Sequence, residues 1–284
     1  MIWGRLLPWV PMISCSFLLL TLSPEQAFAE FEIQESGVEK GEVEGEYRGA
    51  VHWGFPKAEQ GDEEGALEEE EEGPNRQSHD FELQWGITDR WMVSTTLGTD
   101  QPLDDNYGVS SVELEAQYEF IQRDGDGLGL AFTAGYGFAT RDDEADEIEF
   151  GPIVELGSGP LLLTFNPFFS SQVGSNAETD SLGFEYGWRA EYAVAKRWGV
   201  GVEMFGEIED LSLAGTFDSQ EHSIGPTLAY NPGGEDDEGE GEGENAEKVA
   251  GRAEMEFSLN VGVQFGLTDV TSDTALKFQG SLAF

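Results

Sequence analysis

The chain has few basic residues for its length. Lysine and arginine together number 14, against 57 aspartates and glutamates, so the formal net charge is −43 at pH 7 over 284 residues. A protein that binds nucleic acid by neutralising phosphates needs the opposite charge. The same shortage excludes attachment to anionic lipid through a basic patch. The sequence therefore predicts no nucleic-acid partner.

Cysteine is almost absent, and the single one, Cys15, falls in a segment typical of a secretory signal peptide. Residues 1–5 carry one positive charge, residues 10–22 are apolar, and Ala27-Phe28-Ala29 has the small-x-small pattern of a cleavage site. We expect this segment to be removed during export. The mature chain then holds no cysteine and no disulfide.

Two alternatives stay open for this segment. In one of them Cys15 is a lipidated N-terminus, although the apolar run continues past it through Phe17 to Leu20. In the other, the segment remains as an uncleaved anchor helix, which Pro8 and Pro11 weaken.

Long hydrophobic runs are missing from the rest of the chain. No segment after residue 29 approaches the ~18 apolar residues that a membrane-spanning helix needs. The chain nevertheless contains 19 Phe, 7 Tyr and 7 Trp, which are too many aromatic residues for a disordered protein. An exported chain of this composition is either a soluble secreted β protein or an outer-membrane barrel.

Alternation of apolar and polar residues decides between these two classes. From Met255 to Phe265, every odd-numbered position is apolar and every even-numbered one is Glu, Ser, Asn, Gly or Gln. This period of two indicates a strand. Similar segments are ~9–12 residues long, which matches a tilted crossing of a bilayer, whereas strands of globular proteins average about 5–6 residues. Aromatic residues lie near segment ends, where interfacial girdles are expected: Trp53, Trp91, Trp198 and Tyr230.

Twelve such segments predict an all-β fold, a transmembrane antiparallel β-barrel with the even strand number of single-chain bacterial barrels. The expected strands are 42–54, 79–88, 91–99, 110–120, 128–140, 146–156, 161–172, 181–194, 198–209, 221–230, 253–266 and 274–284. The predicted organisation is a signal peptide over 1–29 and a barrel over 30–284. A soluble sheet with its apolar face on a core is the alternative.

Short and long connections alternate along most of the chain. The short ones are 88–90, 157–160 and 195–197, and the longer ones are 55–78, 100–109, 173–180 and 210–220. Short turns face the periplasm in this class, so both termini are expected there. The segment 231–252 is an exception, because it is long where the pattern requires a short turn.

Two acidic segments of low complexity stand out, 59–72 and 235–247. Runs of like charge mixed with glycine are solvated, so we expect acidic flexible loops near 55–78 and 231–252. Binding of a divalent cation would need ligands at fixed spacing, as in D-x-[DN]-x-[DN]-G, and neither segment has it. The sequence therefore predicts no metal site.

The end of the chain resembles an assembly signal. Phe278, Leu282 and Phe284 fall on alternate positions of the last predicted strand. This arrangement resembles the C-terminal signature that the outer-membrane assembly machinery of Gram-negative bacteria recognises. The resemblance implies that the barrel-assembly machinery is a partner of this chain.

Other motifs resemble a family of outer-membrane transporters named for the meta-cleavage pathway of phenol degradation. Residues 266–277 are similar to the closing hairpin of that family, and residues 86–91 and 193–198 are similar to its turn-then-Trp motif. The resemblance covers about 43–284 and implies a transport barrel in the outer membrane. The two acidic segments depart from the family pattern.

If the apolar face of each strand meets lipid, the polar face lines the lumen. The side chains expected there are candidates for selecting solutes. They are Glu44, Glu46, Arg48, Glu82, Glu113, Glu115, Glu185, Arg189, Glu191, Glu203 and Lys277. The excess of carboxylates predicts a negative pore for cationic or neutral solutes. The sequence leaves three states open: an open lumen, one filled by paired side chains, and one plugged by the 55–78 loop.

Catalytic motifs are poorly represented. No G-x-S-x-G, H-E-x-x-H or G-x-x-x-x-G-K sequence is present. One catalytic hypothesis places His52 and His79 together near the outer rim, with Ser78 beside His79 as the nucleophile. We expect no enzymatic activity and no cofactor.

The leading functional hypothesis is a monomeric outer-membrane channel for small solutes, exported through a cleavable signal peptide. Its expected partners are outer-membrane lipid, the assembly machinery and the solutes. The alternative is a structural or surface-interaction barrel with a closed lumen and acidic loops.

Overall fold

The fold is known from a computed structural model of the chain. It describes residues 31–54, 77–101, 106–141, 144–177, 182–232 and 255–284. The predicted signal peptide and both acidic low-complexity segments lie outside these residues. Among the described residues, no helix is long and apolar enough to cross a membrane. The short element η1 (Phe217–Ser219) is a single 3₁₀ turn.

Twelve strands make up the regular structure of this part of the chain. They are β1 (Val43–Trp53), β2 (Gln77–Gly86), β3 (Trp91–Gln101), β4 (Gly108–Ile121), β5 (Gly127–Ala139), β6 (Asp146–Ser158), β7 (Leu161–Val173), β8 (Gly183–Ala195), β9 (Trp198–Ile208), β10 (Glu221–Tyr230), β11 (Glu256–Gly266) and β12 (Thr274–Ala283). Each predicted strand overlaps one observed strand, and their ends differ by at most three residues.

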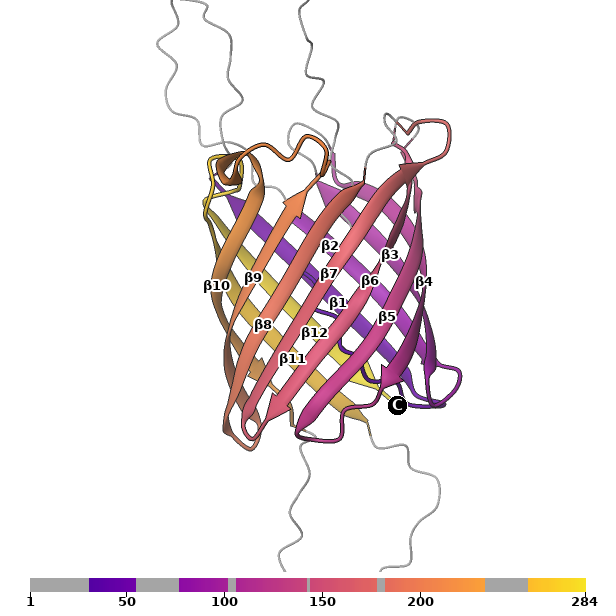
Figure 1. The fold of residues 1–284 in the computed structure, drawn as a ribbon, viewed down its shortest axis with the longest axis vertical. Coiled ribbons are helices and arrows are strands. Elements are labelled where there is room, and N and C mark those ends of the chain that lie inside the picture. Colours follow the sequence, from indigo (N-terminus) through magenta and orange to yellow (C-terminus); the bar gives the residue numbers. More distant parts are fainter. Residues whose placement is uncertain (1–30, 55–76, 102–105, 142–143, 178–181, 233–254) are drawn as a thin grey trace, which may run out of the picture.

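The strands form a closed antiparallel barrel in chain order, as Figure 1 shows. The first and last strands complete it, because β1 pairs with β12 from Glu44 opposite Ala283 to Trp53 opposite Thr274. Closure gives each of the twelve strands two hydrogen-bonded neighbours, so the sheet has no edge. The predicted all-β antiparallel barrel of twelve strands is confirmed.

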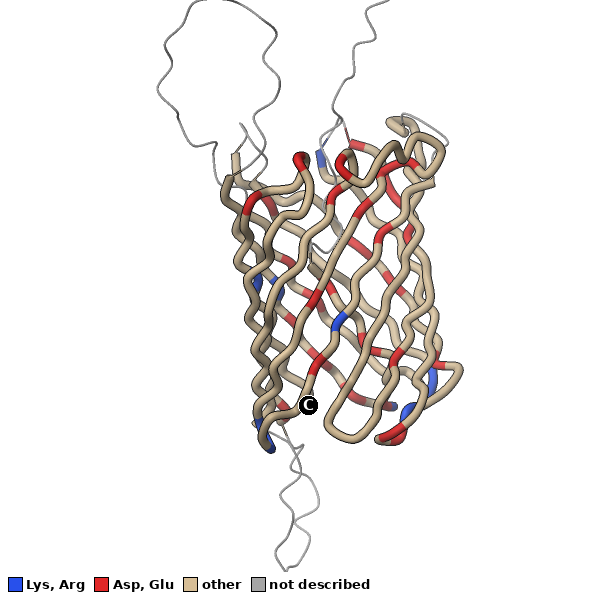
Figure 2. The backbone as a smooth tube through the Cα atoms, turned by 60° about the vertical axis from the view of Figure 1, so that its left-hand side comes forward, with Lys and Arg blue, Asp and Glu red and all other residues tan. Residues whose placement is uncertain are grey.

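Apolar side chains face outward and polar ones face inward. On β2, Phe81 and Trp85 are 50% and 51% exposed, whereas Glu82 between them is 8% exposed. Among the described residues, the buried apolar cluster consists of three side chains, one each from β5, β6 and β7. A soluble sandwich would bury its apolar rows, so that alternative is excluded. An apolar exterior around a polar interior is the architecture of an outer-membrane-type barrel. Figure 2 shows acidic residues recurring along the strands, with few basic ones among them.

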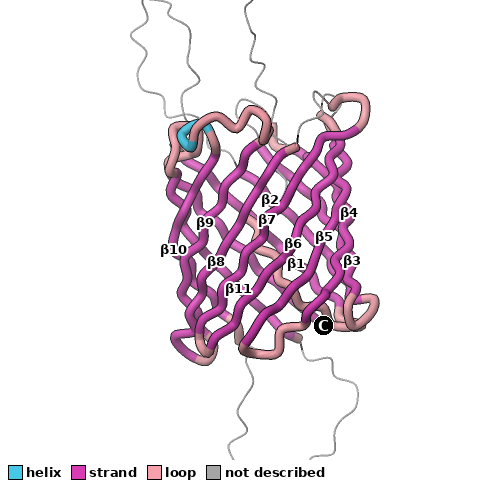
Figure 3. The backbone as a smooth tube through the Cα atoms, viewed as in Figure 1, coloured by secondary structure: helices cyan, strands magenta, loops and turns pink. Residues whose placement is uncertain are grey.

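The two ends of the barrel differ in their connections, as Figure 3 shows. The end where β1 begins and β12 finishes, called here the C-terminal end, carries the short turns β2–β3, β4–β5, β6–β7 and β8–β9. The longer connections, including the one that contains η1, lie at the opposite end, called here the loop end. The connection between β10 and β11 is the long one at the C-terminal end, where the sequence pattern breaks its alternation.

Aromatic residues mark the ends of the strands. At the C-terminal end, Trp198 packs against Tyr230 and Trp91 against Tyr118, with ring centroids 4.6 and 4.8 Å apart. Trp53 closes β1 at the loop end. These are the positions that girdles at the two membrane surfaces occupy in barrels of this class.

Candidate functional site

The lumen is the candidate site, and the eleven predicted lumen residues lie on its wall. They alternate along their strands with apolar residues that are exposed on the outside. On β4, for example, Glu115 is buried and the adjacent Leu114 is 53% exposed. The role of these residues in selecting solutes stays a prediction.

Arg48 on β1 joins three carboxylates in the lumen. Its Nη1 donates to Glu32 at 3.0 Å, to Glu46 at 2.7 Å and to Glu82 at 2.6 Å. Glu46 and Glu82 are register partners on β1 and β2. Glu32, in contrast, belongs to the segment that precedes β1. A single guanidinium, 5% exposed, therefore links the barrel wall to that segment.

Glu203 on β9 is the second centre of ion pairing. It is fully buried and accepts a hydrogen bond from Nε of Arg189 on β8 at 2.7 Å and another from Nζ of Lys277 on β12. The three predicted lumen cations are therefore all engaged with carboxylates. Glu149 and Glu185 form no ion pair with any residue that the structure describes, so part of the acidic wall has no basic partner.

The residues that precede β1 run through the lumen from one end to the other. Phe31 lies near the loop end, where its ring stacks on His52 with centroids 5.3 Å apart. Gly41 lies at the C-terminal end, where its N–H donates to the Gly86 carbonyl at 2.7 Å. Residues 31–41 are called here the luminal segment. A Cβ atom at Gly86 would collide with the backbone of this segment, so glycine permits the close approach.

Side chains from three strands hold the luminal segment. The Gln34 N–H donates to Oδ1 of Asn166 on β7 at 2.7 Å, and Asn166 Nδ2 donates back to the Gln34 carbonyl at 3.2 Å. The Ser36 N–H and hydroxyl both donate to the Glu155 carboxylate on β6. Gln117 on β4 donates through Nε2 to the Ser36 carbonyl at 3.2 Å. The wall therefore supplies the backbone partners that a neighbouring strand would otherwise provide.

Sequence analysis assigns no structure to the luminal segment. The signal that could have found it is the presence of Phe31, Ile33 and Val38 in a stretch that precedes the first predicted strand. Ile33 and Val38 are 2% and 5% exposed, so their burial inside the lumen accounts for them. The expected plug formed by the 55–78 loop falls almost entirely outside the described residues.

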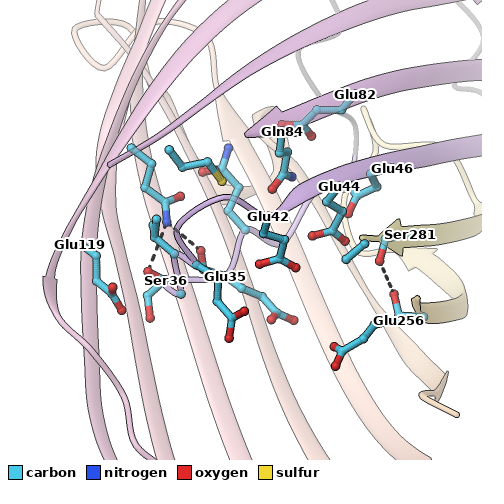
Figure 4. Close-up of a pocket in the computed structure, with 18 of the residues that line it drawn as sticks. Glu35, Ser36, Glu42, Glu44, Glu46, Glu82, Gln84, Glu119, Glu256 and Ser281 are labelled. Carbon is cyan, nitrogen blue, oxygen red and sulfur yellow. Dashed lines mark hydrogen bonds between the residues drawn. The ribbon is translucent and has the colours of Figure 1, made fainter. Parts of the chain in front are cut away.

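A cavity of about 970 Å³ lies beside the luminal segment, toward the C-terminal end. Eleven glutamates line it, and Arg123 is the one cation among the described lining residues. Figure 4 shows carboxylates from the N-terminal residues and the first strands directed toward this space. Burial raises the pKa of the Glu42 carboxyl just before β1, and the negative charges of Glu39 and Glu256 raise it further. Because glutamates dominate its lining, the cavity is called here the acidic vestibule.

The catalytic hypothesis for the outer rim is wrong. His52 faces the lumen, where its Nδ1 lies 2.8 Å from the Ser272 hydroxyl. His79 faces outward and lies 3.0 Å from the Tyr47 hydroxyl. Ser78 faces inward with 4% exposure, because successive residues of a strand point to opposite faces. Ser78 and His79 therefore cannot form a pair, and the two histidines lie on opposite sides of the wall.

Comparison with known proteins finds similar shapes. No protein-family model matches the sequence, and no curated protein matches it either. Among solved structures, the KdgM porin in complex with disordered oligogalacturonate has a TM-score of 0.45 and 10% identity, covering 85% of this chain and 98% of that one. The Acinetobacter baumannii outer membrane protein Omp33 has a TM-score of 0.38 and 9% identity, covering 87% and 99%. The barrel assignment rests on the strand pairing of this chain itself, and the resemblance to the meta-cleavage family stays a prediction.

Proposed function

We propose that this chain is an outer-membrane channel whose acidic lumen passes small cationic or neutral solutes. The observation that carries the proposal is the vestibule, whose eleven glutamates outnumber the three arginines that pair with some of them, Arg123 in its lining and Arg48 and Arg189 beside it. Unpaired carboxylates in a confined space concentrate cations and repel anions. Because short turns face the periplasm in bacterial barrels, the vestibule is the periplasmic mouth of the proposed channel.

In the proposed channel, the luminal segment obstructs the lumen in the closed state. It occupies the lumen from Phe31 near one end to Gly41 at the other, and its described contacts with the wall are noncovalent. Solute passage therefore requires the segment to shift or leave. Glu32 and Ser36 are its principal polar anchors, through Arg48 and Glu155.

Ion selectivity in a planar bilayer tests the proposal. Refolded mature protein, with and without the luminal segment, is inserted into a bilayer that separates two KCl solutions of unequal concentration. The reversal potential is measured, and we expect its sign to show that K⁺ permeates more readily than Cl⁻. The double variant Glu44→Gln/Glu46→Gln should reduce this cation preference, because it removes two charges from the vestibule. Asp89→Asn, in the exposed β2–β3 turn, is the matched control and should leave the preference unchanged. A preference for Cl⁻ in every form would exclude an acidic conducting path.

A structural barrel with a closed lumen is the second candidate. It is favoured by the polar side chains of β4, β6 and β7 that bind the luminal segment from within. In that case neither form of the protein conducts. Deletion of residues 59–72 should then alter surface adhesion or metal binding while solute uptake stays the same.

A further inference from the structure

Three carboxylates converge on the lumen wall away from the ion-pair centres. Glu113 and Glu115 come from β4 and Glu149 comes from β6, and one oxygen of each lies within 4.8 Å of the other two. The strand between them contributes Gly135, which is the register partner of both Glu115 and Glu149. A Cβ atom at this glycine would lie 2.5 Å from Oε1 of Glu113. The missing side chain therefore leaves the space in which the carboxylates meet.

The cluster contains groups that the rest of the described protein leaves without a partner. Glu149 is 7% exposed, and its side chain makes no hydrogen bond or ion pair with any described residue. Gln34 of the luminal segment donates through Nε2 to Glu115 at 3.2 Å. Its other amide atom, Oε1, is buried and accepts no hydrogen bond from the described residues. A neutral oxygen acceptor without a donor thus lies beside the three carboxylates.

No basic side chain forms an ion pair with this cluster in the described part of the chain. The hydrogen bonds of the Arg48 guanidinium go to three other glutamates. Carboxylates this close repel one another unless protons or a cation lie between them. One cation would satisfy the three carboxylates and the orphaned amide oxygen together, because oxygen acceptors are the ligands that hard divalent cations take.

We propose that Glu113, Glu115 and Glu149 bind one divalent cation, with Oε1 of Gln34 as a further ligand. Two oxygens bound to one Ca²⁺ at ~2.4 Å lie at most ~4.8 Å apart, and the cluster satisfies this limit. An all-oxygen set of carboxylates and an amide selects hard cations such as Ca²⁺, Mg²⁺ and Mn²⁺. The cation joins β4 and β6 to the luminal segment, so it is a structural ion of the closed lumen. This site goes beyond the proposed channel and does not depend on conduction.

Mn²⁺ binding to the refolded mature chain tests the site. Electron paramagnetic resonance measures the loss of free Mn²⁺ in about 0.15 M NaCl, which screens exposed acidic segments. We expect one tight site per chain that Ca²⁺ competes for. Glu149→Gln and, separately, Glu113→Gln should each weaken it at least about tenfold, because charge count sets affinity at oxygen sites. Glu147→Gln is the matched control, since it removes the same charge from the same face of β6 and should change affinity far less.

The remaining variants separate this site from the acidic segments and from the channel. A chain lacking 59–72 and 235–247 should keep the tight site, and Gln34→Ala should weaken it without affecting strand content by circular dichroism. Tight Mn²⁺ binding that survives in folded Glu149→Gln and Glu113→Gln overturns the proposal, as does the absence of a tight site in the unmodified chain. If the chain conducts K⁺ but binds no Mn²⁺, the cation site is refuted and the channel proposal is not affected.

Discussion

Deletion of residues 31–38 from the mature chain should raise its single-channel conductance severalfold. These residues run through the lumen from Phe31 near the loop end down to the acidic vestibule. The barrel wall does not need them for its own hydrogen bonding, because every strand already pairs with two neighbours. The deletion leaves Gly41 and its bond to Gly86 in place, so the entry to β1 is preserved.

A point variant distinguishes release of the luminal segment from a change in pore size. Ser36→Ala removes the hydroxyl that donates to Glu155 but keeps the segment in the chain. We expect it to increase the fraction of time that the channel is open, with the open conductance of the intact protein unchanged. If the deleted chain keeps its strand content and conducts no better than the intact one, the lumen is closed by its own wall and the structural-barrel alternative is favoured.

The barrel could be predicted from sequence because one local property specifies it. A strand with a period of two fixes which residues share a face, and a one-residue slip would move every side chain to the other face. On β2 this rule puts Phe81 and Trp85 outside and Glu82 inside without any knowledge of neighbouring strands. The same rule places Arg48, Glu203 and Lys277 in the lumen.

The contacts between lumen residues could not be predicted in this way. The meeting of Glu115 with Glu149 depends on the register of two strand pairs and on Gly135 between them. The luminal segment has no strand period, and it is held by individual side chains such as Asn166. The predicted proximity of His52 and His79 was wrong for a simpler reason. The two residues are on adjacent strands, but their side chains point to opposite faces of the sheet.

Replacement of Glu203 by glutamine should lower the free energy of unfolding by about 3 kcal/mol, more than other single neutralisations in the lumen. Breaking a buried ion pair by removing one partner leaves the other charge uncompensated. Here two cations lose a buried carboxylate at once, because Glu203 is 0% exposed and binds both Arg189 and Lys277, and Arg189 retains only a longer contact with Glu35 at 3.9 Å. Urea unfolding in detergent micelles, followed by tryptophan fluorescence, measures the change through the transition midpoint.

Two further variants decide whether the loss arises from stranded charge. Adding Lys277→Met to Glu203→Gln should restore part of the stability, because it removes from the interior the ammonium that has lost its carboxylate. Glu256→Gln, an exposed glutamate at the start of β11, should change the free energy by no more than about 0.5 kcal/mol. A double variant less stable than Glu203→Gln alone would mean that the Lys277 ammonium contributes mainly through its other contacts, with the Phe205 ring and the Phe31 carbonyl, and that the ion pair is not what joins β8, β9 and β12 inside the barrel.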